Sequence, residues 1–173
     1  MKKNFLTVLI ITFFISASSF AKDSVSQKKM LFHVKTALNK DDAQICAVPN
    51  LVWAAIKKGH DVTVLFDASA VTSVTKGWGW SNFGDSTPMD KAGLPERERQ
   101  ALSKQFGYAI DEIPNNYGEY LHFIKKLGAK LYINRTMMLL FKIDPEQIDL
   151  SLTTIELPQM MDLVSGTDIY MAY

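Results

Sequence analysis

The spacing of apolar residues alternates along the chain between two periods. Short apolar runs of strand length lie at residues 30–36, 61–66, 131–133 and 167–172. The segments between them place apolar residues three or four positions apart, which is the period of a helix with one buried face. Strands that alternate with helices form parallel βαβ units. The pattern therefore predicts an α/β fold, a three-layer sandwich on a mainly parallel sheet.

Turn residues delimit the predicted helices. Each of four helices is followed by a glycine, which readily adopts the left-handed conformation found just after a helix; these glycines are Gly59, Gly107, Gly128 and Gly166. Residues 137–141 (MMLLF) are apolar on every side, which predicts a short helix buried all round. Residues 77–93 follow neither period and predict a long loop, and a short polar helix is expected at 95–106.

The N-terminal segment reads as an export signal. Lys2 and Lys3 precede an apolar run at 5–15, and small residues lead up to Ala21. The apolar run is shorter than the roughly 18 residues that a membrane span needs. We therefore expect cleavage before Lys22, a periplasmic or secreted location, and no membrane association after cleavage. The mature part, 22–173, is predicted to be one domain with an inserted loop and short helix at about 77–106.

Composition limits the partners and cofactors. Residues 1–21 carry two of the 19 basic residues and none of the 18 acidic ones, so the mature chain is nearly neutral and is not expected to bind nucleic acid. The sequence has no Gly-rich phosphate loop, nucleophile elbow or pair of catalytic carboxylates, so no cofactor is expected. His33, His60 and His122 do not have the spacing of metal ligands, so no metal site is expected either.

Polar residues follow the apolar part of three predicted strands. Lys35 and Thr36 end the first strand, Asp67 follows the second, and Asn134 follows the third. The C-terminal ends of parallel strands line one crevice, where ligands collect in open α/β sheets. We therefore expect these side chains to lie close together. An Asp at a strand end can also act only as a turn former or a helix cap.

The corner after the third strand offers groups that suit an anion or a polar ligand. Asn134, Arg135 and Thr136 supply an amide, a positive charge and a hydroxyl beside a helix N-terminus, but no strong nucleophile. Trp78 and Trp80 belong to the long loop. They are expected to close over the crevice, to fill a subunit contact, or to pack the loop onto the domain.

With the strands placed, the chain resembles the DsrE/DsrF-like sulfur-relay family over nearly all of the mature part. The matching segments are GHDVTVLFDASAV (59–71), GAKLYINRTMMLLFKI (128–143) and ELPQMMDLVSGTDIYMAY (156–173). The resemblance implies a DsrE-like fold, a homo-oligomer and a possible sulfur-relay partner. In that family the third strand runs into a cysteine that carries sulfur as a persulfide. Here the position is Asn134, and an amide cannot act as a thiolate nucleophile.

Cys46 is the only cysteine, so no intrachain disulfide can form. It lies near the start of the first predicted helix, where a helix dipole can lower a thiol pKa. Its neighbours Ile45, Ala47 and Val48 favour instead a small buried apolar side chain.

Three functions follow from these observations. The favoured one is an exported DsrE-like protein that acts as a non-catalytic binding or accessory subunit linked to sulfur metabolism, with a small anionic ligand or a sulfur-relay protein as partner. The second is a thiol-dependent sulfur carrier that uses Cys46. The third is a small-molecule enzyme that uses Asp67, Lys35 and Arg135.

Overall fold

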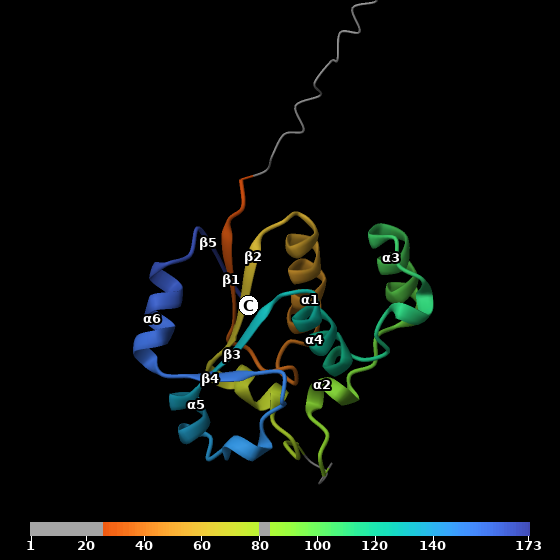
Figure 1. Cartoon of the computed structure of the whole chain (residues 1–173). Coiled ribbons are helices and arrows are strands. Elements are labelled where there is room, and N and C mark those ends of the chain that lie inside the picture. The colour runs from red at the N-terminus through yellow and green to blue at the C-terminus, as the bar shows by residue number, and fades with distance from the viewer. Residues whose placement is uncertain (1–25, 80–83) are drawn as a thin grey trace, which may run out of the picture.

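The computed structural model describes residues 26–79 and 84–173. Within these residues, five strands form one sheet in the order β4-β3-β2-β1-β5, and every neighbouring pair is parallel (Figure 1). The strands are β1 (Lys29–Val34), β2 (Asp61–Phe66), β3 (Lys130–Asn134), β4 (Thr153–Ile155) and β5 (Ile169–Ala172). The predicted α/β class with a parallel sheet is confirmed.

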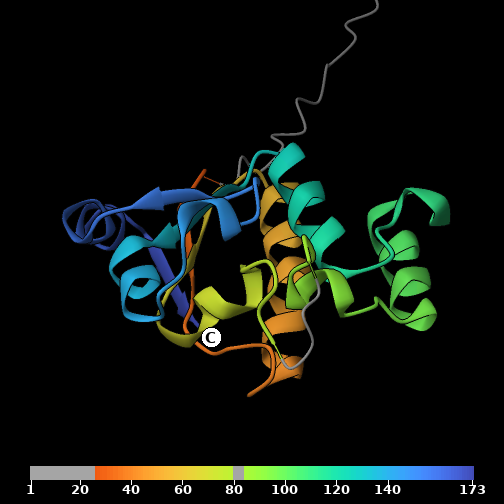
Figure 2. The ribbon, with the colours of Figure 1, turned by 90° about the horizontal axis from the view of Figure 1, so that it is seen from below.

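Helices cover both faces of the sheet. They are α1 (Asp42–Lys57), α2 (Pro88–Lys91), α3 (Glu96–Phe106), α4 (Tyr117–Lys126), α5 (Arg135–Leu140) and α6 (Leu157–Ser165), with 3₁₀ helices η1 (Ala68–Val74), η2 (Ile110–Glu112) and η3 (Pro145–Gln147). Figure 2 shows α1 and α4 side by side, α6 at the opposite end of the molecule, and α3 farthest from the sheet. None of the helices in the described part of the chain is long and apolar enough to cross a membrane.

Alternation along the strands divides the core into two parts. Phe32, Val64 and Ile133 belong to the larger core, which also contains side chains of α1 and α4. Leu31 and Leu65 point to the other face and form a small core with α6. Successive side chains of a strand point to opposite faces, so the residue after an α1-facing position faces α6. This rule places the polar strand-end residues described below on the α6 face.

Three expectations about local structure need correction. Helix α5 is not buried all round, because Leu139 and Leu140 are 67% and 70% exposed. A sequence window of five apolar residues cannot show that one helix face lacks a covering element. The long loop contains α2, whose N-terminus is closed by a capping box between Thr87 and Asp90. Strand β4 was not predicted, because it has only three residues and two of them are exposed threonines.

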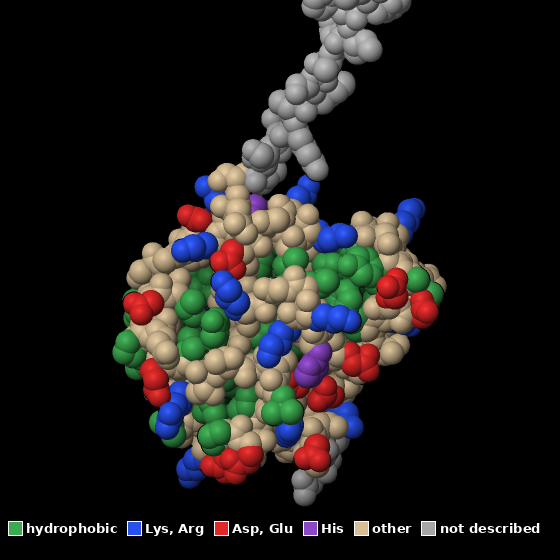
Figure 3. Space-filling model, in the orientation of Figure 1, with side chains coloured by type: hydrophobic (Ala, Val, Ile, Leu, Met, Phe, Trp, Pro, Cys, Tyr) green, Lys and Arg blue, Asp and Glu red, His purple; other side chains and the backbone are tan. Residues whose placement is uncertain are grey.

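The surface carries both charge signs. Figure 3 shows Lys and Arg side chains interspersed with Asp and Glu on the face drawn, and several separate hydrophobic areas, including one low on the left near α5 and α6. Exposed apolar side chains of these two helices include Leu139, Leu157 and Met161. Arg135, the first residue of α5, and Glu156, the N-cap of α6, form an ion pair whose atoms lie 3.2 Å apart.

Candidate functional site

A continuous hydrogen-bonded network crosses the C-terminal ends of three strands and reaches a residue of the edge strand β5. The Tyr170 hydroxyl lies 2.8 Å from Nδ1 of His33, and Nε2 of His33 lies 2.8 Å from Oδ2 of Asp67. The other carboxylate oxygen, Oδ1, accepts a 2.7 Å hydrogen bond from Nδ2 of Asn134. We call these four residues the strand-end network. His33, Asp67 and Asn134 are buried, whereas Tyr170 is 46% exposed.

Sheet register explains why these residues meet. Phe66 of β2 pairs with Ile133 of β3, so Asp67 and Asn134 occupy the next position on adjacent strands. His33 precedes the last residue of β1 and has the same side-chain direction as Leu31, toward α6. Tyr170 pairs with Leu31 on the other side of β1 and reaches the imidazole from the edge strand.

The network holds Asp67 as a carboxylate. Burial raises the pKa of Asp67, but hydrogen bonds from His33, the Ala68 N–H and Asn134 outweigh that effect, so the pKa lies below its ordinary value. A carboxylate can only accept, so the partner Nε2 of His33 must carry a proton. The Tyr170 hydroxyl is the hydrogen-bond partner of the other ring nitrogen, Nδ1, so both nitrogens of His33 are paired.

Both polar atoms of the Asn134 side chain have partners. Its Oδ1 accepts the backbone N–H of Thr136 at 2.9 Å, which makes it the N-cap of α5. Its Nδ2 donates to Asp67 and also lies 3.5 Å from the sulfur of Met160 on α6. The residue is only 2% exposed. The amide therefore closes the strand end instead of presenting a reactive or ligand-binding group there.

The structure brings together only some of the residues that the sequence singled out. Asp67 and Asn134 are in direct contact, and Thr136 contributes its backbone N–H. Lys35 and Thr36 donate their backbone N–H groups to the carbonyl of Tyr173, 2.6 and 3.2 Å away.

Arg135 and Trp78 lie elsewhere. The Arg135 guanidinium pairs with Glu156 on the surface instead of joining the strand-end network. Trp78 packs edge-on against Phe141 at a centroid distance of 6.0 Å. Trp80 lies outside the described residues. The sequence reasoning missed Tyr170 and did not connect His33 to Asp67, although strand alternation places His33 on the face opposite Phe32.

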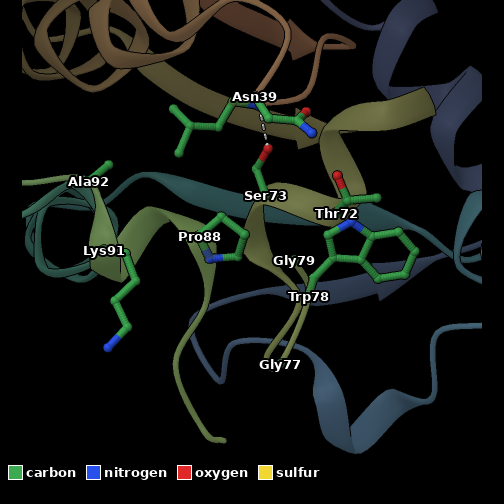
Figure 4. Close-up of a pocket in the computed structure, with 10 residues that line it drawn as sticks. Asn39, Thr72, Ser73, Gly77, Trp78, Gly79, Pro88, Lys91 and Ala92 are labelled. Atoms are coloured by element: carbon green, nitrogen blue, oxygen red, sulfur yellow. Dashed lines mark hydrogen bonds between the residues drawn. The ribbon is translucent and has the colours of Figure 1, made fainter. Parts of the chain in front are cut away.

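A cavity of about 900 Å³ lies beside the strand ends, on the side of α1 and α2. Its walls come from the loop after β1, from η1, from the Trp78 loop and from α2 (Figure 4). Leu38, Trp78, Pro88 and Ala92 make the wall mainly apolar, and Thr72 adds a hydroxyl. Figure 4 shows Pro88 of α2 beside Ser73, with Ala92 and Lys91 farther to the left and Asn39 above.

A second hollow of about 480 Å³ contains the thiol. Cys46, Tyr117 and Pro95 line it, together with Leu38 and Ala92. Burial raises the pKa of Cys46 above its ordinary value; interaction with the Tyr117 hydroxyl opposes this rise, and the charges of Asp42 and Glu98 add to it. The thiol is therefore protonated at neutral pH, in contrast to a thiol activated for nucleophilic attack.

The remaining histidines have protein partners. His60 Nδ1 accepts the Lys28 N–H at 3.3 Å, and His122 Nε2 lies 3.1 Å from Oδ2 of Asp149. In the described part of the chain, no group of three or more His, Cys, Asp or Glu side chains is arranged to hold a metal ion.

Comparisons with known proteins support the fold and no finer identity. No protein-family model matches the chain, and no curated protein matches it. Among solved structures, the crystal structure of the YchN protein from E. coli is similar, with a TM-score of 0.53 and 9% sequence identity. The match covers 85% of this chain and all of that chain. YchN has a DsrE/DsrF-like fold, so the chain described here shares that architecture.

Proposed function

We propose that this protein is an exported, non-catalytic binding or accessory subunit with a DsrE/DsrF-like fold, linked to sulfur metabolism and assembled as a homo-oligomer. The support for a non-catalytic role comes from the side chain of Asn134. In the resembling family a sulfur-carrying cysteine occupies this position. Here an amide that is only 2% exposed makes hydrogen bonds to Asp67 and to the backbone of Thr136.

The two enzymatic alternatives have less geometric support. A small-molecule enzyme would use Asp67, but this carboxylate is enclosed by His33 and Asn134. Among the described residues, neither Lys35 nor Arg135 contacts it. Cys46 stands in a hollow, but its raised pKa disfavours the thiolate that accepts or transfers sulfur. It remains the only thiol of the chain and is the site to test.

Incubation with a sulfane-sulfur donor should leave the wild-type protein without added sulfur. The reason is that the strand end has no thiol and Cys46 is largely protonated. Intact mass followed by peptide mapping gives the result. Asn134→Cys is the matched gain-of-function variant, because a thiol there stands at the N-terminus of α5 beside free backbone N–H groups.

Cys46→Ser provides the control for this experiment. In Asn134→Cys, added sulfur should map to residues 134–143 and should remain there when Cys46→Ser is also present. This result would indicate that the site geometry survives and that only the nucleophile is missing. Sulfur mapped to Cys46 of the wild type would contradict the proposal and favour the thiol carrier.

Export is tested separately. We expect the secreted protein to begin at Lys22 and to remain in the soluble fraction, because the apolar run at 5–15 is short and small residues precede Ala21. The protein is recovered after expression in a host with a periplasm, and its intact mass shows whether residues 1–21 have been removed. A membrane-bound product that retains residues 1–21 would show that the segment is an anchor.

A further inference from the structure

We infer that the two hollows beside Leu38 form one binding cleft, which runs from Trp78 to Cys46 and takes an elongated, mainly apolar small molecule without net charge. This inference rests on the proposed binding function and gives it a site distinct from the strand end. No residue of the strand-end network lines either hollow.

The two hollows share part of their walls. Leu38, from the loop after β1, and Ala92, the C-cap of α2, line both. The larger hollow extends from them to Trp78, and the smaller extends to Cys46 and Tyr117. A volume of about 900 Å³ in the larger part alone is within the range of small-molecule sites, roughly 300–1,000 Å³.

The lining selects for apolar surface. Trp78 and Pro88 offer flat faces for an aromatic or cyclic group, and Pro95 and Cys46 extend the apolar wall at the other end. Thr72 donates its hydroxyl to the Ser69 carbonyl at 2.8 Å, which leaves its oxygen able to accept a hydrogen bond from a ligand.

Charge at the two ends argues against a strongly ionic ligand. The wall of the larger hollow includes one basic side chain, Lys91, and that of the smaller includes one acidic side chain, Asp42. The two walls together therefore carry one charge of each sign and no excess charge that would select a net anion or a net cation. A neutral molecule with one polar group fits both ends.

Hydrogen bonds hold two of the walls in place. The N–H groups of Ala37 and Leu38 donate to the hydroxyls of Ser69 and Ser73 at 3.0 and 2.8 Å, so the loop after β1 is fastened to η1. On the opposite wall, Asp90 accepts from both the backbone and the side chain of Thr87.

Helix α2 is also seated tightly on α4. Gly118 of α4 lies so close to Asp90 that an added Cβ would collide with the carboxylate and come within 3.1 Å of the Asp90 Cα. A cleft whose walls are already in place loses less conformational entropy when a ligand binds.

The test uses N-phenyl-1-naphthylamine, a neutral apolar fluorophore, with the mature protein. We expect saturable binding at one site per chain, and we expect bound probe to slow alkylation of Cys46 by iodoacetamide, because this thiol lines the cleft and is the only one in the chain. Alkylation is measured by mass at alkaline pH, where the thiol ionises.

Two variants address the cleft directly. Ala92→Trp fills the point that both hollows share, and Trp78→Ala removes the flat wall. Each should weaken probe binding by about tenfold or more, which corresponds to about 1.4 kcal/mol. Arg135→Ala is the matched control, since this exposed side chain pairs with Glu156 outside the cleft, and it should bind the probe as the wild type does. Circular dichroism verifies that each variant is folded.

Any of three results would overturn the inference: probe binding that does not saturate, probe binding that is unchanged in Trp78→Ala, or a rate of Cys46 alkylation that the probe does not affect. If Ala92→Trp does not fold, Trp78→Ala and the alkylation rate still decide the result. The sulfur-loading experiment uses no probe, so a negative probe result together with a wild type that carries no added sulfur would reject only the cleft.

Discussion

Replacing Asp67 by Ala is expected to destabilise the protein by about 2–6 kcal/mol, because each of the two buried donors that lose their acceptor costs about 1–3 kcal/mol. The substitution leaves Nε2 of His33 and Nδ2 of Asn134 without their acceptors in a buried place. Unpaired buried donors carry the cost of desolvation without a compensating hydrogen bond. Urea unfolding followed by circular dichroism measures the loss.

Asp61→Ala is the matched control. Asp61 begins the strand that Asp67 follows, and its carboxylate pairs with Lys130 at 2.8 Å, but both side chains are substantially exposed. Exposed ion pairs contribute about 0–1 kcal/mol. A loss in Asp67→Ala no greater than that in Asp61→Ala would show that the strand-end network does not stabilise the fold.

The destabilisation should depend on pH. Because the folded pKa of Asp67 is lowered, its carboxylate contributes stability that is fully present above the unfolded pKa of about 3.9. That contribution is lost as the pH falls through the lower folded pKa. The difference in unfolding free energy between wild type and Asp67→Ala should therefore be steady near neutral pH and shrink in acid. A difference that grows in acid would show that Asp67 is held in its protonated form.

Replacing Trp53 by Ala is expected to cost about 3–5 kcal/mol, the usual range for removing a large aromatic side chain from a core. Trp53 is 0% exposed. Its ring stacks on Phe106 at 4.1 Å and meets Tyr108, Tyr120 and Phe123 edge-on at 4.8–5.9 Å. The substitution therefore removes a ring that four other aromatic rings contact.

The loss of Trp53 should also loosen one particular region. Phe106 ends α3 and Tyr108 follows it, so this aromatic cluster fastens the segment around α3 to α1 and α4. Hydrogen exchange of residues 96–108 should accelerate more in Trp53→Ala than exchange of β1 and β2.

Trp53→Phe is the control for ring size and polarity. It keeps an aromatic ring and removes Nε1, a buried donor that has no hydrogen-bond partner among the described residues. We expect it to cost about 1–2 kcal/mol, clearly less than Trp53→Ala. Equal losses in the two variants would show that an aromatic ring at this position is not sufficient to stabilise this cluster.

Local sequence signals were sufficient to predict the class of fold and most of its elements. The run at 61–66 became β2 with the same bounds, and the helix predicted before Gly128 became α4. Strand periodicity, capping residues and glycines act over a few positions, so they can be read without the fold. The same logic placed Asp67 and Asn134 at one edge of the sheet, where they share a hydrogen bond.

The tertiary structure decided which other residues join that edge. Tyr170 and His33 are 137 positions apart and meet only because β5 lies beside β1 in the sheet order. Arg135 was predicted to face the crevice from its place after β3, yet its guanidinium pairs with Glu156, the N-cap of α6. Likewise, Trp78 and Cys46 border one cleft through Leu38 and Ala92, although each lies in a different element. Sheet order and helix docking are set by burial over the whole chain, and a local pattern of apolar and polar residues does not contain that information.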